Sequence, residues 1–97
     1  MLFALINTDR PGALELRMAT RPAHLAFMAE QAAKIVSAGA LLDAEGRPAG
    51  TLALLELPDR AAAEAFAAAD PYAKAGLFES SVLRPFRPVY RDGVKVA

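Results

Sequence analysis

The chain of 97 residues has no cysteine, no tryptophan and only one histidine, His24. Without cysteine there are no disulfides and no thiol catalysis, and the absence fits a reducing compartment, so we expect a cytoplasmic protein. A single histidine without cysteine is a poor ligand set for a transition metal, and we expect no metal. The six glycines form neither a dinucleotide fingerprint nor a phosphate-binding loop, so we expect no cofactor.

The chain also lacks an excess of charge and long apolar runs. Eleven basic residues balance eleven acidic ones, and no basic stripe alternates with aromatic residues, which argues against nucleic acid as a partner. No apolar run is long enough to span a membrane, so we expect no membrane partner. The first residues, Met1 to Asn7, lack the basic start of a signal peptide, and we interpret them as a strand.

Hydrophobic residues, by contrast, make up 55% of the chain, which is enough for one small domain with a core. We expect a single domain over residues 1–97, with a loose tail over 91–97. The sequence pattern predicts four strands, over residues 2–8, 40–44, 50–57 and 78–89. It predicts helices over residues 13–18, 20–38 and 60–69, and one helical turn over 72–76.

These elements follow the ferredoxin-like order βαββαβ, which gives an α+β fold with an antiparallel sheet covered by helices on one face. We expect Thr20 to cap the long second helix and Gly39 to end it. One face of this helix is apolar and carries Leu25, Met28, Ala32, Ile35 and Val36. The strands are apolar on both sides, so we expect a second copy to cover the free face of the sheet in a two-fold homodimer.

His24 falls at the edge of this apolar stripe, and Asp70 lies before Pro71 and the helical turn expected over 72–76. A His–Asp pair can transfer protons, because the carboxylate orients the ring and stabilises the imidazolium. Two plainer interpretations remain open: His24 as a structural histidine on a helix flank, and Asp70 as the cap of the helical turn.

Three further residues are candidates for contacts with a substrate. Arg17 and Arg21 lie one turn apart, and Arg21 lies one turn before His24. Both arginines can bind a substrate carboxylate, or they can belong to a solvated helix face. Tyr72 can donate a hydrogen bond to a substrate, or it can simply cover the core.

Three segments of the chain form a recognisable pattern. The two most specific are Arg-Pro-Ala-His-Leu at 21–25 and Asp-Pro-Tyr-Ala-Lys-Ala-Gly at 70–76, and Val-Leu-Arg-Pro-Phe-Arg-Pro-Val follows at 82–89. These segments resemble the YciI-like (YCII-related) proteins. The resemblance extends from about Leu2 to Tyr90. It implies a dimeric α+β barrel of ferredoxin-like subunits, with a cleft in which the family histidine, matching His24, approaches the family aspartate, matching Asp70.

The resemblance also implies a range of reactions. Some relatives act as dehydrochlorinases on muconate-type ring-cleavage products, and the wider superfamily includes muconolactone isomerases. The connection between Ala40 and Thr51 is shorter here than in longer members of the family, so the resemblance does not carry a substrate across.

Our leading hypothesis is a small cytoplasmic enzyme that transfers a proton on a small anionic organic molecule, without a cofactor. His24 acts as general acid or base and Asp70 orients it, whereas Arg21, Arg17 and Tyr72 contact the substrate. Lyase, isomerase or dehydrochlorinase chemistry fits this arrangement. The alternatives are a non-catalytic, ligand-binding or accessory dimeric protein, and a purely structural dimeric module.

Overall fold

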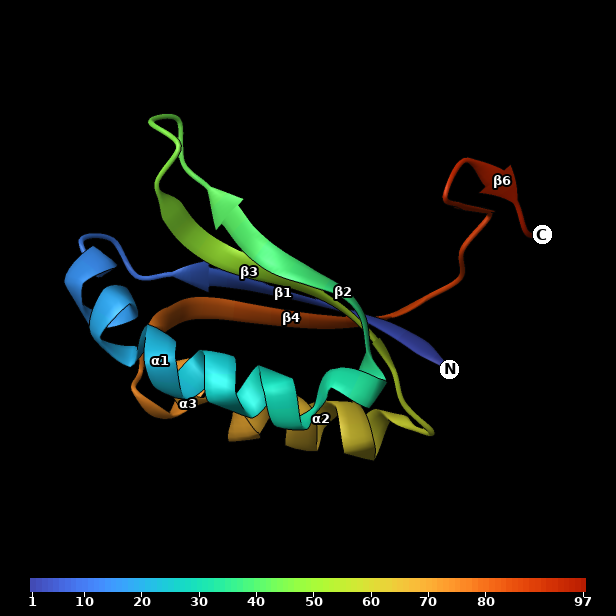
Figure 1. Ribbon diagram of the computed structural model, residues 1–97, viewed down its shortest axis with the longest axis horizontal. Helices are drawn as coiled ribbons and strands as arrows, with labels where there is room; N and C mark the ends of the chain where they lie inside the picture. Colours follow the sequence, from blue (N-terminus) through green and yellow to red (C-terminus); the bar gives the residue numbers. More distant parts are fainter.

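The computed structural model describes residues 1–97 and confirms the α+β class with an antiparallel sheet. All three α-helices lie on one face of the sheet, and no element covers the opposite face (Figure 1). The main elements are β1 (Leu2–Asp9), α1 (Leu14–Glu30), β2 (Ile35–Leu42), β3 (Pro48–Glu56), α2 (Arg60–Ala69), α3 (Pro71–Lys74) and β4 (Phe78–Phe86).

The four strands lie in the order β2-β3-β1-β4, and each neighbouring pair is antiparallel. Alternate residues of the central strand β1 point to opposite faces of the sheet. Phe3 and Leu5 are buried in the core, together with Leu55 of β3 and Phe66 of α2. Phe27 of α1 packs on Phe66 with ring centroids 5.2 Å apart. This core holds the helices against the inner face of the sheet.

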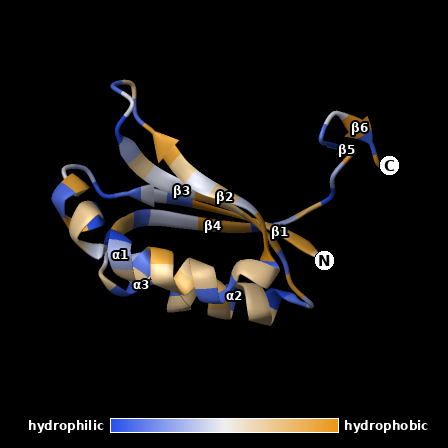
Figure 2. Ribbon diagram, in the orientation of Figure 1, coloured by the Kyte–Doolittle hydropathy of each residue, from blue (hydrophilic) through white to orange (hydrophobic).

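The outer face of the sheet is apolar and exposed. Ile6 of β1 lies opposite Leu52 of β3 and Val82 of β4 in the strand register. These three side chains are 38%, 44% and 41% exposed, respectively. Figure 2 shows hydrophobic segments in the strands as well as in the helices. None of the helices combines the length and the apolar character needed to cross a membrane.

The N-terminal half of α1 differs from the prediction. We expected a short helix, a break and a new helix capped by Thr20, but α1 continues through Thr20 and Pro22 without interruption. Proline at position 22 removes the hydrogen bond to the carbonyl of Met18. Pro22 and Met18 are both exposed, so water can satisfy that carbonyl and the helix tolerates the proline.

The C-terminal end of α1 was also predicted wrongly. The helix ends at Glu30, a 3₁₀ turn follows at Ala32–Lys34, and the residues expected to continue the helix begin β2 instead. Ile35 pairs with Leu55, and Gly39 lies opposite Leu52 within the strand rather than ending a helix. The short apolar run fits either periodicity, and the β-branched pair Ile35 and Val36 favours a strand.

The chain after β4 is more ordered than a loose tail. β5 (Tyr90–Arg91) pairs with β6 (Val94–Lys95) in a small hairpin. Asp92 and Gly93 both have positive φ, as a two-residue Asp-Gly hairpin turn requires. The hairpin residues are exposed, and the hairpin extends away from the sheet and helices (Figure 1). The last long strand, β4, ends at Phe86, before the expected Val89.

Candidate active site

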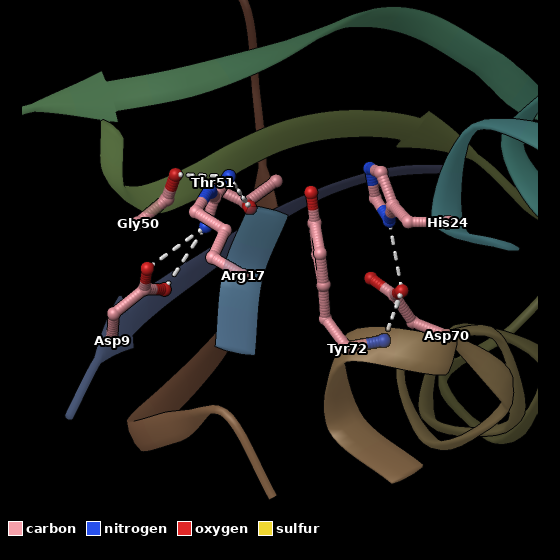
Figure 3. A network of polar contacts seen from close by, with 7 residues as sticks. All are labelled: Asp9, Arg17, His24, Gly50, Thr51, Asp70 and Tyr72. Carbon is pink, nitrogen blue, oxygen red and sulfur yellow. Dashed lines mark hydrogen bonds and ion pairs between the residues drawn. The ribbon is translucent and has the colours of Figure 1, made fainter. Parts of the chain in front are cut away.

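His24 and Asp70 are brought together by α1 and the start of α3. The Nδ1 atom of His24 lies 2.8 Å from Oδ1 of Asp70 (Figure 3). Both residues are buried, with 8% and 2% of their surface exposed. The same Oδ1 atom accepts a hydrogen bond from the backbone N–H of Tyr72 at 2.9 Å, so Asp70 also caps α3. Its two expected roles, as helix cap and as histidine partner, are compatible.

The contact with Asp70 determines which nitrogen of His24 remains without a partner in the chain. An ionised carboxylate only accepts hydrogen bonds, so Nδ1 carries the proton in the neutral ring and Nε2 keeps a free lone pair. Nε2 lies at the end of the ring opposite Asp70, and no group of the chain hydrogen-bonds to it (Figure 3). His24 can therefore accept a proton at Nε2 from a molecule in the cavity that its side chain lines.

Tyr72 lies in the middle of a three-layer stack. Its ring is stacked on His24, with centroids 4.0 Å apart and planes at 17°. On the other face, the guanidinium carbon of Arg17 lies 4.6 Å from the ring centroid, as in a cation–π contact. The stack fixes the plane of the imidazole, since the ring of Tyr72 on which it lies is supported on its other face by Arg17.

The hydroxyl group of Tyr72 remains available as a donor. Burial raises the pKa of Tyr72 above its ordinary value of 10.0, although the positive charges of Arg17 and Arg21 act in the opposite direction. The phenol is therefore protonated at neutral pH. Tyr72 lines the same cavity as His24, and no side chain or backbone group of the chain takes up its hydroxyl.

Arg17 is buried rather than on a solvated face. One terminal nitrogen donates to both carboxylate oxygens of Asp9 at 3.0 Å. The other donates to the carbonyl of Gly50 at 3.0 Å and to the hydroxyl of Thr51 at 3.2 Å. The protein itself thus occupies both terminal nitrogens, which the sequence hypothesis assigned to a substrate carboxylate. Arg17 ties α1 to β1 and β3 and supports the ring of Tyr72.

Sequence reasoning missed Asp9, Gly50 and Thr51. Nothing in the local sequence pattern indicates that the carboxylate of Asp9 turns inward toward α1. At Gly50, an added Cβ would lie 2.5 Å from the carbonyl oxygen of Asn7 on the neighbouring strand. Only glycine allows this close approach, which also sets the position of the carbonyl that Arg17 contacts.

Arg21 differs from Arg17 although both lie on the same face of α1. It is exposed, lines the cavity, and makes no ion pair or side-chain hydrogen bond within the chain. Its positive charge acts to lower the pKa of Tyr72, which lines the same cavity. Arg21 is therefore the arginine that is available to an anionic ligand.

The cavity between α1 and strands β2 and β3 has a volume of about 670 Å³. Its polar wall consists of Arg17, Arg21, His24, Thr51 and Tyr72. Its apolar wall includes Met18, Leu25, Met28, Ile35 and Leu42. No group of three or more His, Cys, Asp or Glu side chains lies close enough together to hold a metal ion.

Comparison with known proteins identifies the family. The sequence model of the YCII-related domain matches residues 1–87. The chain belongs to the YCII-related domain family. Protein YciI of Escherichia coli is 33% identical to this YCII-related chain over an alignment of 98 residues. The alignment covers 93% of this chain and 100% of YciI. The resemblance expected from the sequence is thus confirmed.

The solved structures that resemble the YCII-related chain include the following two. One is 5-chloro-2-hydroxyhydroquinone dehydrochlorinase (TftG) from Burkholderia phenoliruptrix, in complex with 2,5-dihydroxybenzoquinone. It has a TM-score of 0.86 and 32% identity, and the match covers 90% of this chain and 94% of TftG. The other, an antibiotic biosynthesis monooxygenase, has a TM-score of 0.53 and 18% identity over 91% of this chain and 100% of that chain. The second likeness concerns the fold alone.

Proposed function

We propose that this YCII-related protein is a cofactor-independent enzyme that transfers a proton on a small anionic organic substrate, with His24 as the general acid or base. The observation that carries the proposal is the 2.8 Å contact between His24 Nδ1 and Asp70 Oδ1, which leaves Nε2 free beside the cavity. The likeness to a dehydrochlorinase over 90% of the chain supports the enzyme class.

Asp70, Tyr72 and Arg21 each have a separate role beside His24 in this proposal. Asp70 keeps the proton on Nδ1 and stabilises the imidazolium that forms when Nε2 takes a proton from carbon. The hydroxyl of Tyr72 donates a hydrogen bond to the substrate oxygen on which negative charge develops. The guanidinium of Arg21 pairs with an anionic group of the substrate.

The reaction class follows from these roles. In a dehydrochlorination, Nε2 removes a proton from carbon, the C–H electron pair forms a new double bond, and chloride leaves with the C–Cl pair. The products together are the dehydrochlorinated molecule and HCl, so no oxidant or reductant is consumed. Lyase and isomerase reactions begin with the same proton removal, and the same residues serve them.

The experiment that tests the proposal follows two reactions. One is chloride release from 5-chloro-2-hydroxyhydroquinone, and the other is exchange of the ring protons of 2,5-dihydroxybenzoquinone in D₂O. We expect wild type to accelerate at least one of them, and His24→Gln to lower that rate by about 10²- to 10⁴-fold. Glu30→Gln, on the exposed surface of the same helix, serves as the control and should retain the full rate.

Two outcomes contradict the proposal. If His24→Gln is folded by circular dichroism and its rate is unchanged, His24 is not the general acid or base. Binding of 2,5-dihydroxybenzoquinone to wild type without acceleration of either reaction supports the non-catalytic, ligand-binding alternative.

We also propose that the protein is a homodimer that pairs through the outer face of the sheet. The exposed apolar side chains of Ile6, Leu52 and Val82 support this arrangement, because burying such a patch against a second copy is favourable. Leu52→Lys should shift the mass measured by light scattering from dimer to monomer, whereas Lys74→Glu, at an exposed site on α3, should not. A dimer that persists in Leu52→Lys contradicts this interface.

A further inference from the structure

The size of the cavity and the distribution of its residues point to a particular class of substrate. Its volume of about 670 Å³ lies within the roughly 300–1,000 Å³ typical of pockets that bury drug-sized ligands. A single hydroxylated ring at His24 would leave much of this volume empty. The residues that line the remaining volume therefore indicate which other chemical groups the substrate has.

The polar wall offers one unpaired positive charge. The guanidinium of Arg17 is neutralised by Asp9, with side chains that are 5% and 7% exposed. Arg21 has no acidic partner in the chain. A ligand with one anionic group can pair with Arg21, whereas a second anionic group would find no free cation in the cavity wall.

The apolar wall is unusual because much of it is exposed. Met18, Leu25 and Leu42 are 51%, 46% and 63% exposed, and all three line the cavity. Large apolar side chains that gather around a cavity and remain exposed mark a surface for an apolar ligand. Met18 and Met28 add flexible side chains that adapt to ligands of different shape.

The two walls are arranged in order along α1. Arg21, His24 and Met28 follow one another at intervals of three and four residues, so they lie on one face of the helix. Met28 lies seven positions after Arg21, which corresponds to roughly 10 Å along the helix axis. His24 lies between them. A ligand bound at Arg21 therefore passes Nε2 of His24 before it reaches Leu25 and Met28.

We propose that the cavity selects amphipathic organic monoanions, in which the anionic group pairs with Arg21 and a hydrocarbon tail extends past His24 to Leu25, Met28 and Ile35. The inference rests on the proposed function for the position of the reacting carbon beside His24. The binding preference itself follows from charge and apolar surface alone.

The test measures the dissociation constants of butyrate, hexanoate and octanoate by titration of wild-type amide signals in NMR spectra. Affinity should rise by about fourfold per added methylene, the equivalent of ~0.8 kcal/mol for each buried CH₂. Adipate, with the length of hexanoate and a second carboxylate, should bind more weakly than hexanoate.

Three variants separate the two walls of the cavity. Arg21→Gln should weaken all three carboxylates by a similar factor, up to about fivefold, because an exposed ion pair contributes up to ~1 kcal/mol. Leu25→Gln should leave butyrate unchanged and reduce the gain from butyrate to octanoate. Leu14→Gln, on the same helix but outside the cavity wall, is the matched control and should change nothing.

Three outcomes overturn the inference: equal affinities for butyrate and octanoate, tighter binding of adipate than of hexanoate, or a Leu25→Gln variant that changes only the oligomeric state. The last result would assign the apolar wall to a second copy of the chain. These outcomes differ from failure of the proposed function, because a flat affinity series with His24-dependent turnover overturns only the substrate class. A rising series with His24-independent turnover overturns only the proposed catalytic role.

Discussion

Two buried acid–base contacts lie on either side of Tyr72, and they differ in what they leave free. Arg17 and Asp9 form a closed pair, in which both terminal nitrogens of the guanidinium donate to groups of the protein. His24 and Asp70 form an open pair, in which Asp70 occupies one ring nitrogen and no group of the chain hydrogen-bonds to the other, on a side chain that lines the cavity. The same helix thus supplies a closed contact and an open one, two turns apart.

Buried polar groups that only stabilise the fold can thus be distinguished from those that are available to a ligand. A group whose hydrogen-bonding atoms are all paired within the chain stabilises the fold but has nothing left to offer a substrate. A group with one atom held by the protein and another free at a cavity is oriented for reaction. Breaking the Arg17–Asp9 pair should therefore lower the free energy of unfolding, whereas breaking the His24–Asp70 pair should lower turnover.

The largest effect on stability should come from breaking the closed pair. Arg17→Met leaves the carboxylate of Asp9 buried without its cation, and we expect the free energy of unfolding to fall by about 3–5 kcal/mol. Urea denaturation measures this loss. Glu64→Gln, which breaks the exposed pair with Arg60, should cost less than about 1 kcal/mol. Equal losses in the two variants would contradict the structural role of Arg17.

A smaller effect, on turnover alone, should follow from Tyr72→Phe. The variant keeps the stacked ring but loses a hydroxyl that no group of the chain holds, so the thermal midpoint should stay within a few degrees of wild type. Turnover should fall by about 10²-fold, the effect of removing one donor to a developing oxyanion. Tyr90→Phe, in the exposed C-terminal hairpin, is the matched control. Wild-type turnover in Tyr72→Phe would remove the hydroxyl from the mechanism.

The smallest effect concerns stability at alkaline pH. Burial raises the pKa of Tyr72 in the folded state above 10.0, so the unfolded chain loses this proton first as the pH rises. The contribution of Tyr72 to stability is thus fully present below pH 10.0 and is lost above it. The difference in unfolding free energy between wild type and Tyr72→Phe should be constant up to that pH and then move against wild type. A difference that is independent of pH up to 11 would contradict a buried phenol.

The sequence predicted the fold class and the contact between His24 and Asp70, for different reasons. Strand and helix order follow from local periodicity, and Pro71 marks the end of α2 and the cap at Asp70. The meeting of His24 with Asp70 was expected from family resemblance, since 46 residues separate them and no local pattern brings them together. Helix periodicity did not locate the end of α1, because Ile35 and Val36 fit a strand as well.

The closed pair could not be predicted in the same way. Asp9 and Arg17 come from different elements, and their contact depends on how α1 packs on β1 and β3. The two arginines of α1 look equivalent in the sequence, one turn apart on a single face. Only the tertiary structure distinguishes them. The close approach of β1 and β3 at Gly50 brings a backbone carbonyl within hydrogen-bond distance of Arg17. Arg21, by contrast, is exposed and lines the cavity.

We infer that Asp70 holds His24 with Nδ1 protonated and Nε2 free. The most direct test is ¹⁵N NMR of the imidazole ring, in wild type and in Asp70→Asn, at a pH where the ring is neutral. We expect wild type to carry its proton on Nδ1, and Asp70→Asn, which keeps the helix cap, to lose that preference. A wild-type ring protonated on Nε2, or a tautomer that does not respond to Asp70→Asn, would contradict the account.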